Sequence, residues 1–347
     1  MGAKRNLIGG DEKKNKEVGC IPNRNQIPWL ILLPETNNNN NSNNNNSCVL
    51  FVPEDKDRVY KTRDLGFEFS KSRCLMTCGS WLLMSSPKRD LYMINPLTSE
   101  RIDLPNTDKL KASLEFEGAC FWIDNETKDY IVIWKMAMST MFIKKGDDNT
   151  WHEFPLYSWR EDMILNHKNQ KLYLYHHKNP INIWDFSGDK PVEEDDGSYL
   201  GSFWFNHYDF PSYVDEGDEN EEELYWQKLM HHTTRIAVTV SGHVLMVASI
   251  LFSCKTWHFR VYKRDLAQCR WVKIDSLGDH ALIYDMGITV VAKDIPGIKR
   301  NSIYFSGRGD DPDQIFVYDL STQKMETLPK HVFSSIRFSH ARWFLPC

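Results

Sequence analysis

The chain has 347 residues, with 42 Lys and Arg against 47 Asp and Glu, and a formal net charge of −5. This balance gives no electrostatic support for nucleic acid as a partner. The longest apolar runs, Ile27–Leu33 and Val244–Phe252, are far shorter than the ~20 residues that span a bilayer, so no membrane association is expected. The N-terminus mixes charges of both signs and has no apolar core, which argues against a secretory signal. We therefore expect a cytoplasmic and/or nuclear protein whose cysteines are reduced.

Short apolar segments separated by polar turns run through most of the chain. Residues 1–26 are polar and aperiodic and predict a disordered lead-in. Pro28–Leu33 and Cys48–Val52 predict two strands, and the Asn-rich residues 37–47 between them predict an expanded loop. The predicted strand pairs that follow are Trp81–Ser85 with Leu91–Ile94, Phe121–Ile123 with Tyr130–Trp134, Met163–Leu165 with Lys171–Tyr175, Arg235–Val240 with Val244–Ile250, and Ile288–Ala292 with Ser302–Phe305. The best position for an amphipathic helix is Glu221–Met230.

An internal repeat indicates the architecture. Leu91–Pro105 aligns without gaps on Ile315–Pro329, and each copy reads as a strand, a polar turn that starts at Asn95 or Asp319, a second strand and then Leu-Pro. Weaker copies occur at Ile183–Phe186, at Val261–Arg264 leading into Trp271, and at Met141–Lys145 leading into Trp151. Such a pattern is typical of the outer hairpins of propeller blades, which cannot bury their apolar faces alone and must stack on their neighbours.

We therefore predict an all-β fold and favour a β-propeller over the alternative of two β-sandwiches. At ~45 residues per blade, the length left after the lead-in and two low-complexity insertions gives about six blades, with seven possible. The predicted organisation is a lead-in, residues 1–26, followed by one propeller domain, residues 27–347. That domain contains the Asn-rich loop, residues 37–47, and an acidic insertion, residues 191–226.

Residues with the spacing of a metal site are sparse. Cys74 and Cys78 could form half of a zinc site, but no second Cys or His pair lies nearby, so buried structural thiols are expected. The pairs His176-His177 and His231-His232 would point to opposite faces of a strand, which prevents either pair from chelating one metal unaided. We predict no metal-ligating residue and no cofactor.

Catalytic patterns are equally weak. Asp279-His280 has the residue types of an acid–base dyad. Adjacent residues rarely form such a dyad, so a structural role is expected. Gly307–Asp310 lacks the third glycine and the helix of a phosphate-binding loop. No catalytic or cofactor-binding residue is predicted, and the chain is expected not to be an enzyme. Trp81 and Trp271 lie in apolar strands and are predicted to be core anchors.

The one strong charge feature is acidic. Between Pro191 and Trp226 there are many carboxylates and no Lys or Arg. One interpretation is a loop that docks a basic partner or folds back on the basic remainder of the chain; the other is a solvated insertion that tolerates charge. The candidate partner-binding residues are Asp215, Glu216, Asp218, Glu219, Glu221, Glu222 and Glu223.

Several blocks of sequence occur in the order seen in a known family. They are Pro28–Leu30, Gly79–Met84, Asn95–Thr98, Ile102–Pro105, Ser241–Val247, Phe259–Tyr262, Trp271–Leu282, Asn301–Phe305, Val317–Asp319 and Trp343–Pro346. In these blocks the chain resembles the plant F-box-associated β-propeller family, which is related to kelch-type F-box proteins. The resemblance implies a kelch-like propeller that binds protein partners and takes part in substrate recognition for ubiquitin-mediated protein degradation in plants.

Members of that family usually carry an F-box that docks on a Skp subunit. The residues before Trp29 show no helical apolar periodicity, so an F-box is expected to be missing or degenerate and direct Skp binding is not expected. Two alternatives stay open. One is a propeller enzyme or carbohydrate-binding protein, which would need several carboxylates or histidines converging on a central channel. The other is an F-box-less competitor or a decaying family copy.

Overall fold

The described part of the chain is almost entirely β-structure. The computed structural model describes residues 28–34, 46–52, 59–106, 116–136, 140–146, 148, 150–154, 162–166, 168–176, 179–194, 229–253, 255–265, 270–293, 295, 297–306, 314–328 and 338–346. Within these ranges there is one five-residue α-helix, α1 (Phe67–Lys71), and a single 3-10 turn, Tyr284–Met286. No helix in the described part is both long and apolar enough to cross a membrane.

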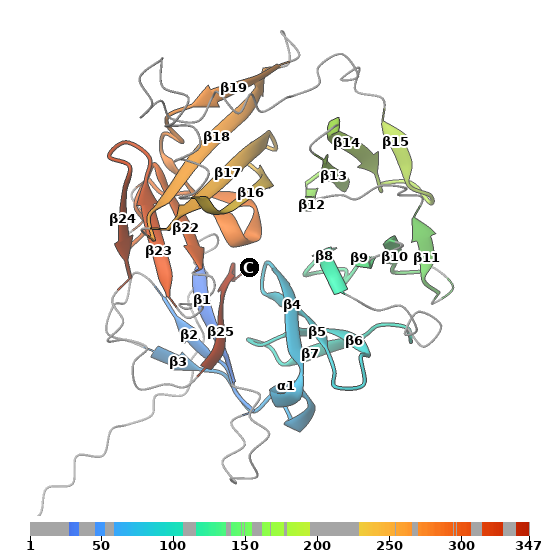
Figure 1. Ribbon diagram of the computed structural model, residues 1–347. Coiled ribbons are helices and arrows are strands. Elements are labelled where there is room, and N and C mark those ends of the chain that lie inside the picture. The colour runs from blue at the N-terminus through green and yellow to red at the C-terminus, as the bar shows by residue number, and fades with distance from the viewer. Residues whose placement is uncertain are drawn as a thin grey trace, which may run out of the picture.

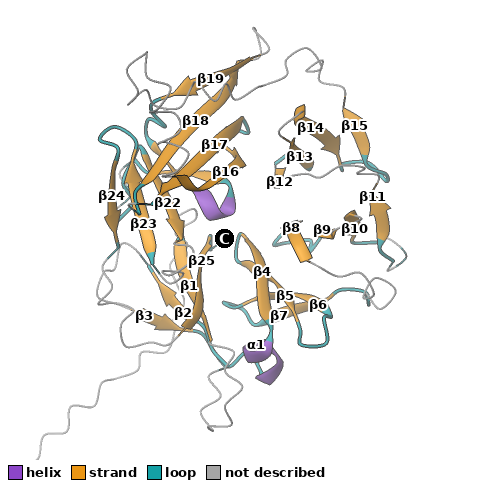
Figure 2. Ribbon diagram, in the orientation of Figure 1, coloured by secondary structure: helices purple, strands orange, loops and turns teal. Residues whose placement is uncertain are grey.

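Four consecutive hairpin-connected units follow one pattern, in which four antiparallel strands run outward in chain order (Figures 1 and 2). Blade 2 is β4 (Arg73–Cys78), β5 (Trp81–Ser85), β6 (Leu91–Asn95) and β7 (Glu100–Asp103). Blade 3 is β8 (Phe116–Ile123), β9 (Tyr130–Met136), β10 (Thr140–Lys144) and β11 (His152–Phe154). Blade 4 is β12 (Asp162–Asn166), β13 (Lys171–His176), β14 (Asn179–Asp185) and β15 (Val192–Glu194). Blade 5 is β16 (Leu229–Val238), β17 (Val244–Phe252), β18 (Trp257–Asp265) and β19 (Arg270–Ile274).

The two ends of the chain share blade 1. Its strand order is β25 (Phe338–Phe344), β1 (Trp29–Pro34), β2 (Val49–Phe51) and β3 (Val59–Lys61), so the last strand pairs with the first. Next to it on the ring, Thr77 in blade 2 donates a 2.7 Å hydrogen bond from Oγ1 to the carbonyl of Trp343. The pairing of β25 with β1 closes the ring that is visible in Figure 1, where the strand β25 ends near the centre.

Blade 6 departs from the pattern. It consists of β20 (His280–Ile283), β21 (Ile288–Val291), β22 (Ser302–Ser306), β23 (Ile315–Asp319) and β24 (Lys324–Thr327). The prediction that Ile288–Ala292 pairs with Ser302–Phe305 is wrong. Instead, β20 lies between the two strands: β21 is its antiparallel partner and β22 its parallel partner. A single parallel pair, Val238 with Ile288, joins blade 6 to blade 5, so the nine-stranded sheet consists of two blades. The described strands thus form six blades, and the predicted all-β propeller is confirmed.

The hydrophobic core lies between the blades. Side chains alternate along a strand, so each strand can face both neighbouring blades. In β5, Trp81 and Leu83 pack against blade 3, whereas Leu82 and Met84 pack toward blade 1. The same division recurs around the ring, with separate clusters between blades 3 and 4, 4 and 5, and 5 and 6. This two-sided burial explains why the strands read as unbroken apolar runs.

The internal repeat corresponds to equivalent outer hairpins of blades 2 and 6. Asn95 ends β6 and accepts hydrogen bonds at Oδ1 from the backbone N–H groups of Leu97 (3.0 Å) and Thr98 (3.3 Å). Asp319 ends β23 and accepts the same two bonds from the N–H groups of Ser321 (2.8 Å) and Thr322 (3.0 Å). Short polar side chains are favoured at these positions because they cap the turn that reverses the chain.

Several predicted segments fall partly or wholly outside the described residues, namely the lead-in 1–26, most of the Asn-rich loop, most of the acidic insertion, and residues 221–228 of the candidate helix. The last two residues of that candidate, Leu229 and Met230, belong to strand β16. At the end of the Asn-rich loop, Asn46 accepts a 2.9 Å hydrogen bond at its carbonyl from the N–H of Leu65. At the start of the acidic insertion, β15 completes blade 4, with Glu194 bound to Lys171 at 2.7 Å.

Candidate binding site at the mouth of the central channel

A cavity of about 280 Å³ lies at the centre of the ring. Each of the six blades contributes to its wall through or next to its innermost strand. Representative lining residues, one from each blade, are Leu345, Cys78, Phe121, Leu165, Val238 and Ile288. The turns that follow the inner strands β4, β8, β12 and β16 also reach the cavity, so it lies toward the face of the propeller where those turns emerge. A concave, mainly apolar space with a few polar groups is the usual form of a ligand site.

The end of β12 and the turn that follows it place an amide and an ammonium at this mouth. Asn166 is 1% exposed, and its Oδ1 accepts a 3.0 Å hydrogen bond from the backbone N–H of Lys168. The Lys168 ammonium donates to the carbonyl of Val240 in the turn after β16. The Nδ2 group of Asn166 is buried and has no hydrogen-bond partner among the residues that the structure describes. A buried donor without a partner is costly, and in native proteins it calls for a specific explanation.

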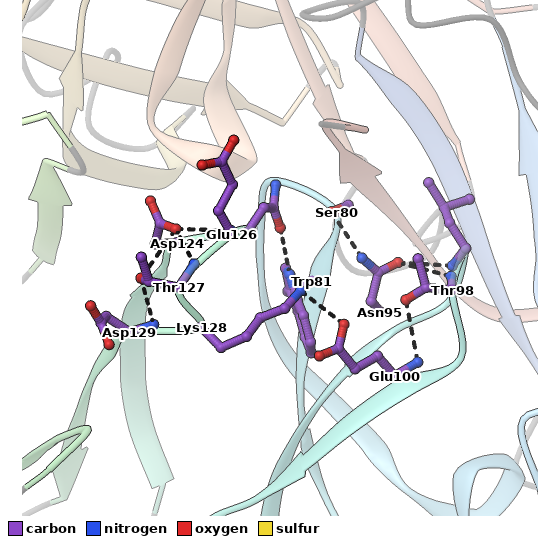
Figure 3. A network of polar contacts seen from close by, with 12 residues as sticks. Ser80, Trp81, Asn95, Thr98, Glu100, Asp124, Glu126, Thr127, Lys128 and Asp129 are labelled. Carbon is purple, nitrogen blue, oxygen red and sulfur yellow. Dashed lines mark hydrogen bonds and ion pairs between the residues drawn. The ribbon is translucent and has the colours of Figure 1, made fainter.

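The turn between β8 and β9, in which Asp124, Glu126, Thr127 and Lys128 are labelled in Figure 3, supplies a second amide. Asp124 begins this turn and accepts bonds at Oδ1 from the N–H groups of Thr127 (2.7 Å) and Glu126 (2.8 Å), which lower the pKa of its carboxyl. The turn holds Asn125 over blade 2, where its Oδ1 accepts a 2.7 Å bond from the indole N–H of Trp81. Lys128 lies 5.0 Å from the centroid of the Trp81 ring and forms a 2.8 Å ion pair with Glu100 of β7.

Close to the cavity, Asp162 and Arg235 form an electrostatically coupled pair on β12 and β16. Asp162 as a whole residue is partly exposed, but its carboxyl is surrounded by protein, and this burial raises its pKa. Arg235 and the N–H of Ile236, which donates a 2.8 Å bond to Asp162 Oδ2, oppose that rise. The guanidinium of Arg235 also lies 5.2 Å from the ring centroid of Tyr284. The bond from Ile236 joins β16 of blade 5 to Asp162 of blade 4, so this carboxyl links two blades and has a structural role.

The thiols in the described part of the chain do not gather at one point. A bulge in β4 between Cys74 and Met76 changes the alternation, so Cys74 packs toward blade 1 and Cys78 toward blade 3. Cys78 and Cys120 both line the cavity, and burial raises the pKa of the Cys120 thiol well above its ordinary value. Burial likewise raises the pKa of Cys74, to about 11. Among the described residues no group of three or more His, Cys, Asp or Glu could hold a metal ion.

The other residues singled out from the sequence lie away from the cavity or outside the described ranges. His231 bonds Thr233 at 2.6 Å, while its neighbour His232 is exposed, as expected for opposite faces of a strand. His280 faces the carbonyl of Leu277 at 3.3 Å, and the backbone carbonyl of Asp279 accepts from Ala292. The seven acidic candidates, Asp215, Glu216, Asp218, Glu219, Glu221, Glu222 and Glu223, all lie outside the described residues, so their role stays a prediction.

Sequence reasoning missed Asn125, Asn166 and Lys168. Asn125 and Lys168 lie in tight turns, and Asn166 ends strand β12 just before one. The strand pattern does locate both turns, between Phe121–Ile123 and Tyr130–Trp134 and between Met163–Leu165 and Lys171–Tyr175. A polar turn between strands is expected to be a surface loop, and nothing in the local pattern distinguishes turns at the channel from turns at the rim. Only ring closure places these two turns at one cavity.

Together the closed ring of blades and the cavity at its axis define a β-propeller with a candidate binding site at the channel mouth. The chain matches the KIB1-4 beta-propeller family over residues 50–319 and belongs to that family. Two relatives from Arabidopsis thaliana are named as F-box proteins. A putative F-box protein is 46% identical over 340 residues, covering 94% of this chain and 85% of the relative. Another F-box protein is 48% identical over 335 residues, covering 94% and 86%.

Two solved structures resemble the fold distantly. One, described as YCF48 bound to D1 peptide, is 9% identical with a TM-score of 0.33 and covers 83% of this chain and 84% of its own. The other is a fucose lectin from Kordia zhangzhouensis in complex with methyl-fucoside, 9% identical with a TM-score of 0.23, covering 45% of this chain and 97% of its own. Likeness at this level does not bear on function.

Proposed function

We propose that the chain is a non-enzymatic, protein-interaction β-propeller that recognises substrates for F-box-type ubiquitin ligases. The observation that carries the proposal is the identity of 46% and 48% to proteins named as F-box proteins, which extends over 94% of this chain. Fold alone does not define function, but close similarity through the whole propeller supports a shared role.

The architecture supports a binding role. Closed, apolar interfaces between blades make a stiff scaffold, and the turns at the channel mouth can vary without disturbing them. The described residues that line the cavity include no carboxylate and no histidine. General acid–base chemistry uses such groups most often, so this lining favours recognition over catalysis.

The test is carried out in plant cells with the full chain fused to a proximity-labelling enzyme. The labelled proteins are identified, and their half-lives are compared in cells with and without the chain, and with and without an inhibitor of cullin ligases. The control is the labelling enzyme expressed alone. Imaging the same fusion tests the expected cytoplasmic and/or nuclear location.

The expected result is at least one labelled protein that is degraded more slowly when either the chain or cullin activity is removed. If no labelled protein changes its half-life on loss of the chain, the proposed role in protein turnover is wrong. This outcome concerns protein partners in cells and leaves the chemistry of the channel mouth to be tested separately.

A further inference from the structure

The hydrogen bonds at the channel mouth fix which way its two amides face. Asn166 must present Oδ1 to the backbone N–H of Lys168, because that N–H can only donate; the atom left over is therefore Nδ2, a donor. The same argument applies to Asn125, whose Oδ1 faces the indole N–H of Trp81. Both amides thus keep donor groups for whatever lies beside them, and both residues line the cavity.

The charge at the channel mouth also favours a ligand that accepts hydrogen bonds, and in particular an anion. Lys168 is the one ammonium or guanidinium residue among the described lining residues, and no described carboxylate lines the cavity with it. Lys168 reaches the turn after β16 through the carbonyl of Val240. A Cβ at Gly242, in the same turn, would lie 3.7 Å from Asn166 Nδ2, so the unpartnered amide and the ammonium approach one turn. An ammonium has three donor hydrogens, and one bond to a carbonyl leaves two of them for a further acceptor.

The remainder of the wall is mainly apolar, with Thr77, Thr239 and Thr289 as further polar residues. It includes Trp81, Phe121, Ile164, Val238, Met286 and Leu345. An apolar cavity of ~150 Å³ accommodates benzene, so about 280 Å³ leaves room for an aromatic ring with a short side arm. We propose that the mouth of the central channel binds a small organic carboxylate with an aromatic-sized apolar body, the carboxylate meeting Asn166 Nδ2 and the Lys168 ammonium. This inference does not depend on the proposed role in protein turnover.

The chemistry of the ligand is tested by calorimetry on the purified full chain with matched compounds. 3-Phenylpropanoate is compared with 3-phenylpropanamide, 3-phenylpropylamine and propanoate, which change the acid, the charge and the apolar body in turn. 3-Phenylpropanoate is expected to bind at one site with a dissociation constant below about 1 mM. The amide and propanoate should each bind about tenfold or more weakly, because a charge-assisted bond or the apolar body is lost. Equal binding of acid, amide and amine, or no binding of the acid, overturns the proposal.

Two variants locate the site, with thermal unfolding as the check on folding. Lys168→Gln removes the charge and should weaken 3-phenylpropanoate about tenfold. Asn166→Asp keeps the acceptor that holds the turn but replaces the free donor with an acceptor, so it should abolish binding of the acid. The control is Lys88→Gln, an exposed lysine in the turn between β5 and β6 that should bind like the wild type. If Asn166→Asp does not fold, Lys168→Gln alone decides, and wild-type affinity in that variant contradicts the proposal.

The same carboxylate could belong to the end of a polypeptide. The peptide acetyl-Gly-Gly-Phe with a free C-terminus is therefore compared with 3-phenylpropanoate in the same assay. Weaker binding of the peptide supports a free small acid as the ligand. Tighter binding of the peptide overturns that assignment and identifies the C-terminus of a protein as the ligand.

Discussion

The indole N–H of Trp81 donates a 2.7 Å hydrogen bond to Oδ1 of Asn125 and thereby ties blade 2 to the turn that follows the inner strand of blade 3. Trp81 is 0% exposed and packs in the cluster between these blades, beside Val132 and Trp134. The same side chain lines the central cavity. One residue therefore supports both an interface between blades and the wall of the candidate binding site.

Replacing Trp81 with Ala should destabilise the fold by ~3–5 kcal/mol, the range for a fully buried large aromatic side chain. Trp271→Ala is the matched comparison. The sequence predicts that both are core anchors, but Trp271 is only partly buried on β19, the outermost strand of blade 5, so its loss should cost less. Urea unfolding of the two variants measures the difference. Equal losses of unfolding free energy in the two variants would show that the difference in burial between Trp81 and Trp271 does not determine the cost of removing them.

A second pair of equivalent residues tests the repeat. Ser99 and Gln323 occupy the same place in the two aligned hairpins, and both have left-handed backbone conformations, with φ of 63° and 55°. A side chain in this region costs ~1–2 kcal/mol, which glycine avoids while losing ~0.5–1 kcal/mol through its greater freedom when unfolded. Ser99→Gly and Gln323→Gly should therefore be neutral or stabilising by up to about 1.5 kcal/mol.

Thr322→Gly supplies the control, because φ at Thr322 is not positive and only the entropic loss remains. It should be destabilising by ~0.5–1 kcal/mol in the same denaturation experiment. The interpretation fails if all three glycine variants lose the same stability, since the left-handed conformation would then carry no measurable strain.

The aligned hairpins also show how far the sequence determines the fold. Strand pairs such as Met163–Leu165 with Lys171–Tyr175 were predictable because both partners and their turn lie in one short segment. The parallel pairing of β20 with β22 was not, since β21 intervenes and parallel neighbours are not signalled by a tight turn. The burial of Trp81 and the partial exposure of Trp271 depend on position within a blade, from the innermost strands to the outer edge. The local apolar pattern around Trp81 is similar to that around Trp271, so the sequence does not distinguish them.

The candidate site was less predictable than the fold. Asn125 and Asn166 lie on different blades, and their shared cavity follows from the closure of the ring. Their turn-forming role can be inferred from residue type, because Asn and Asp hydrogen-bond to the backbone that follows them. That Asn166 Nδ2 has no partner among the described residues cannot be inferred in this way, because it depends on which groups the neighbouring blade places beside it.

The coupled pair at Asp162 should give the protein a specific pH dependence. Burial raises the pKa of this carboxyl in the folded protein above its ordinary value of 3.8, so the folded state holds a proton that the unfolded chain has already released. The contribution of Asp162 to the unfolding free energy is therefore greatest below its unfolded pKa and falls as the pH rises through its folded pKa. The stability of the wild type relative to Asp162→Asn should fall over that acidic range and then level off.

Asp124→Asn is the control of opposite sign. The N–H groups of Thr127 and Glu126 lower the pKa of Asp124, so its contribution is present above the unfolded pKa and is lost as the pH falls through the folded value. Urea unfolding between about pH 3 and 7 yields both difference curves. Slopes of the same sign for the two variants would contradict the assigned environments.

The Asn-rich loop joins β1 to β2 and is predicted to contribute little to stability. Deleting residues 38–43 shortens the connection while leaving Asn46, whose carbonyl accepts from Leu65. Loop-closure entropy varies only with the logarithm of length, so the change in unfolding free energy should stay within about 1 kcal/mol. Leu50→Ala, at a 0% exposed position in β2, should cost ~2–5 kcal/mol in the same urea titration. A deletion as damaging as Leu50→Ala would show that the tract packs against the propeller.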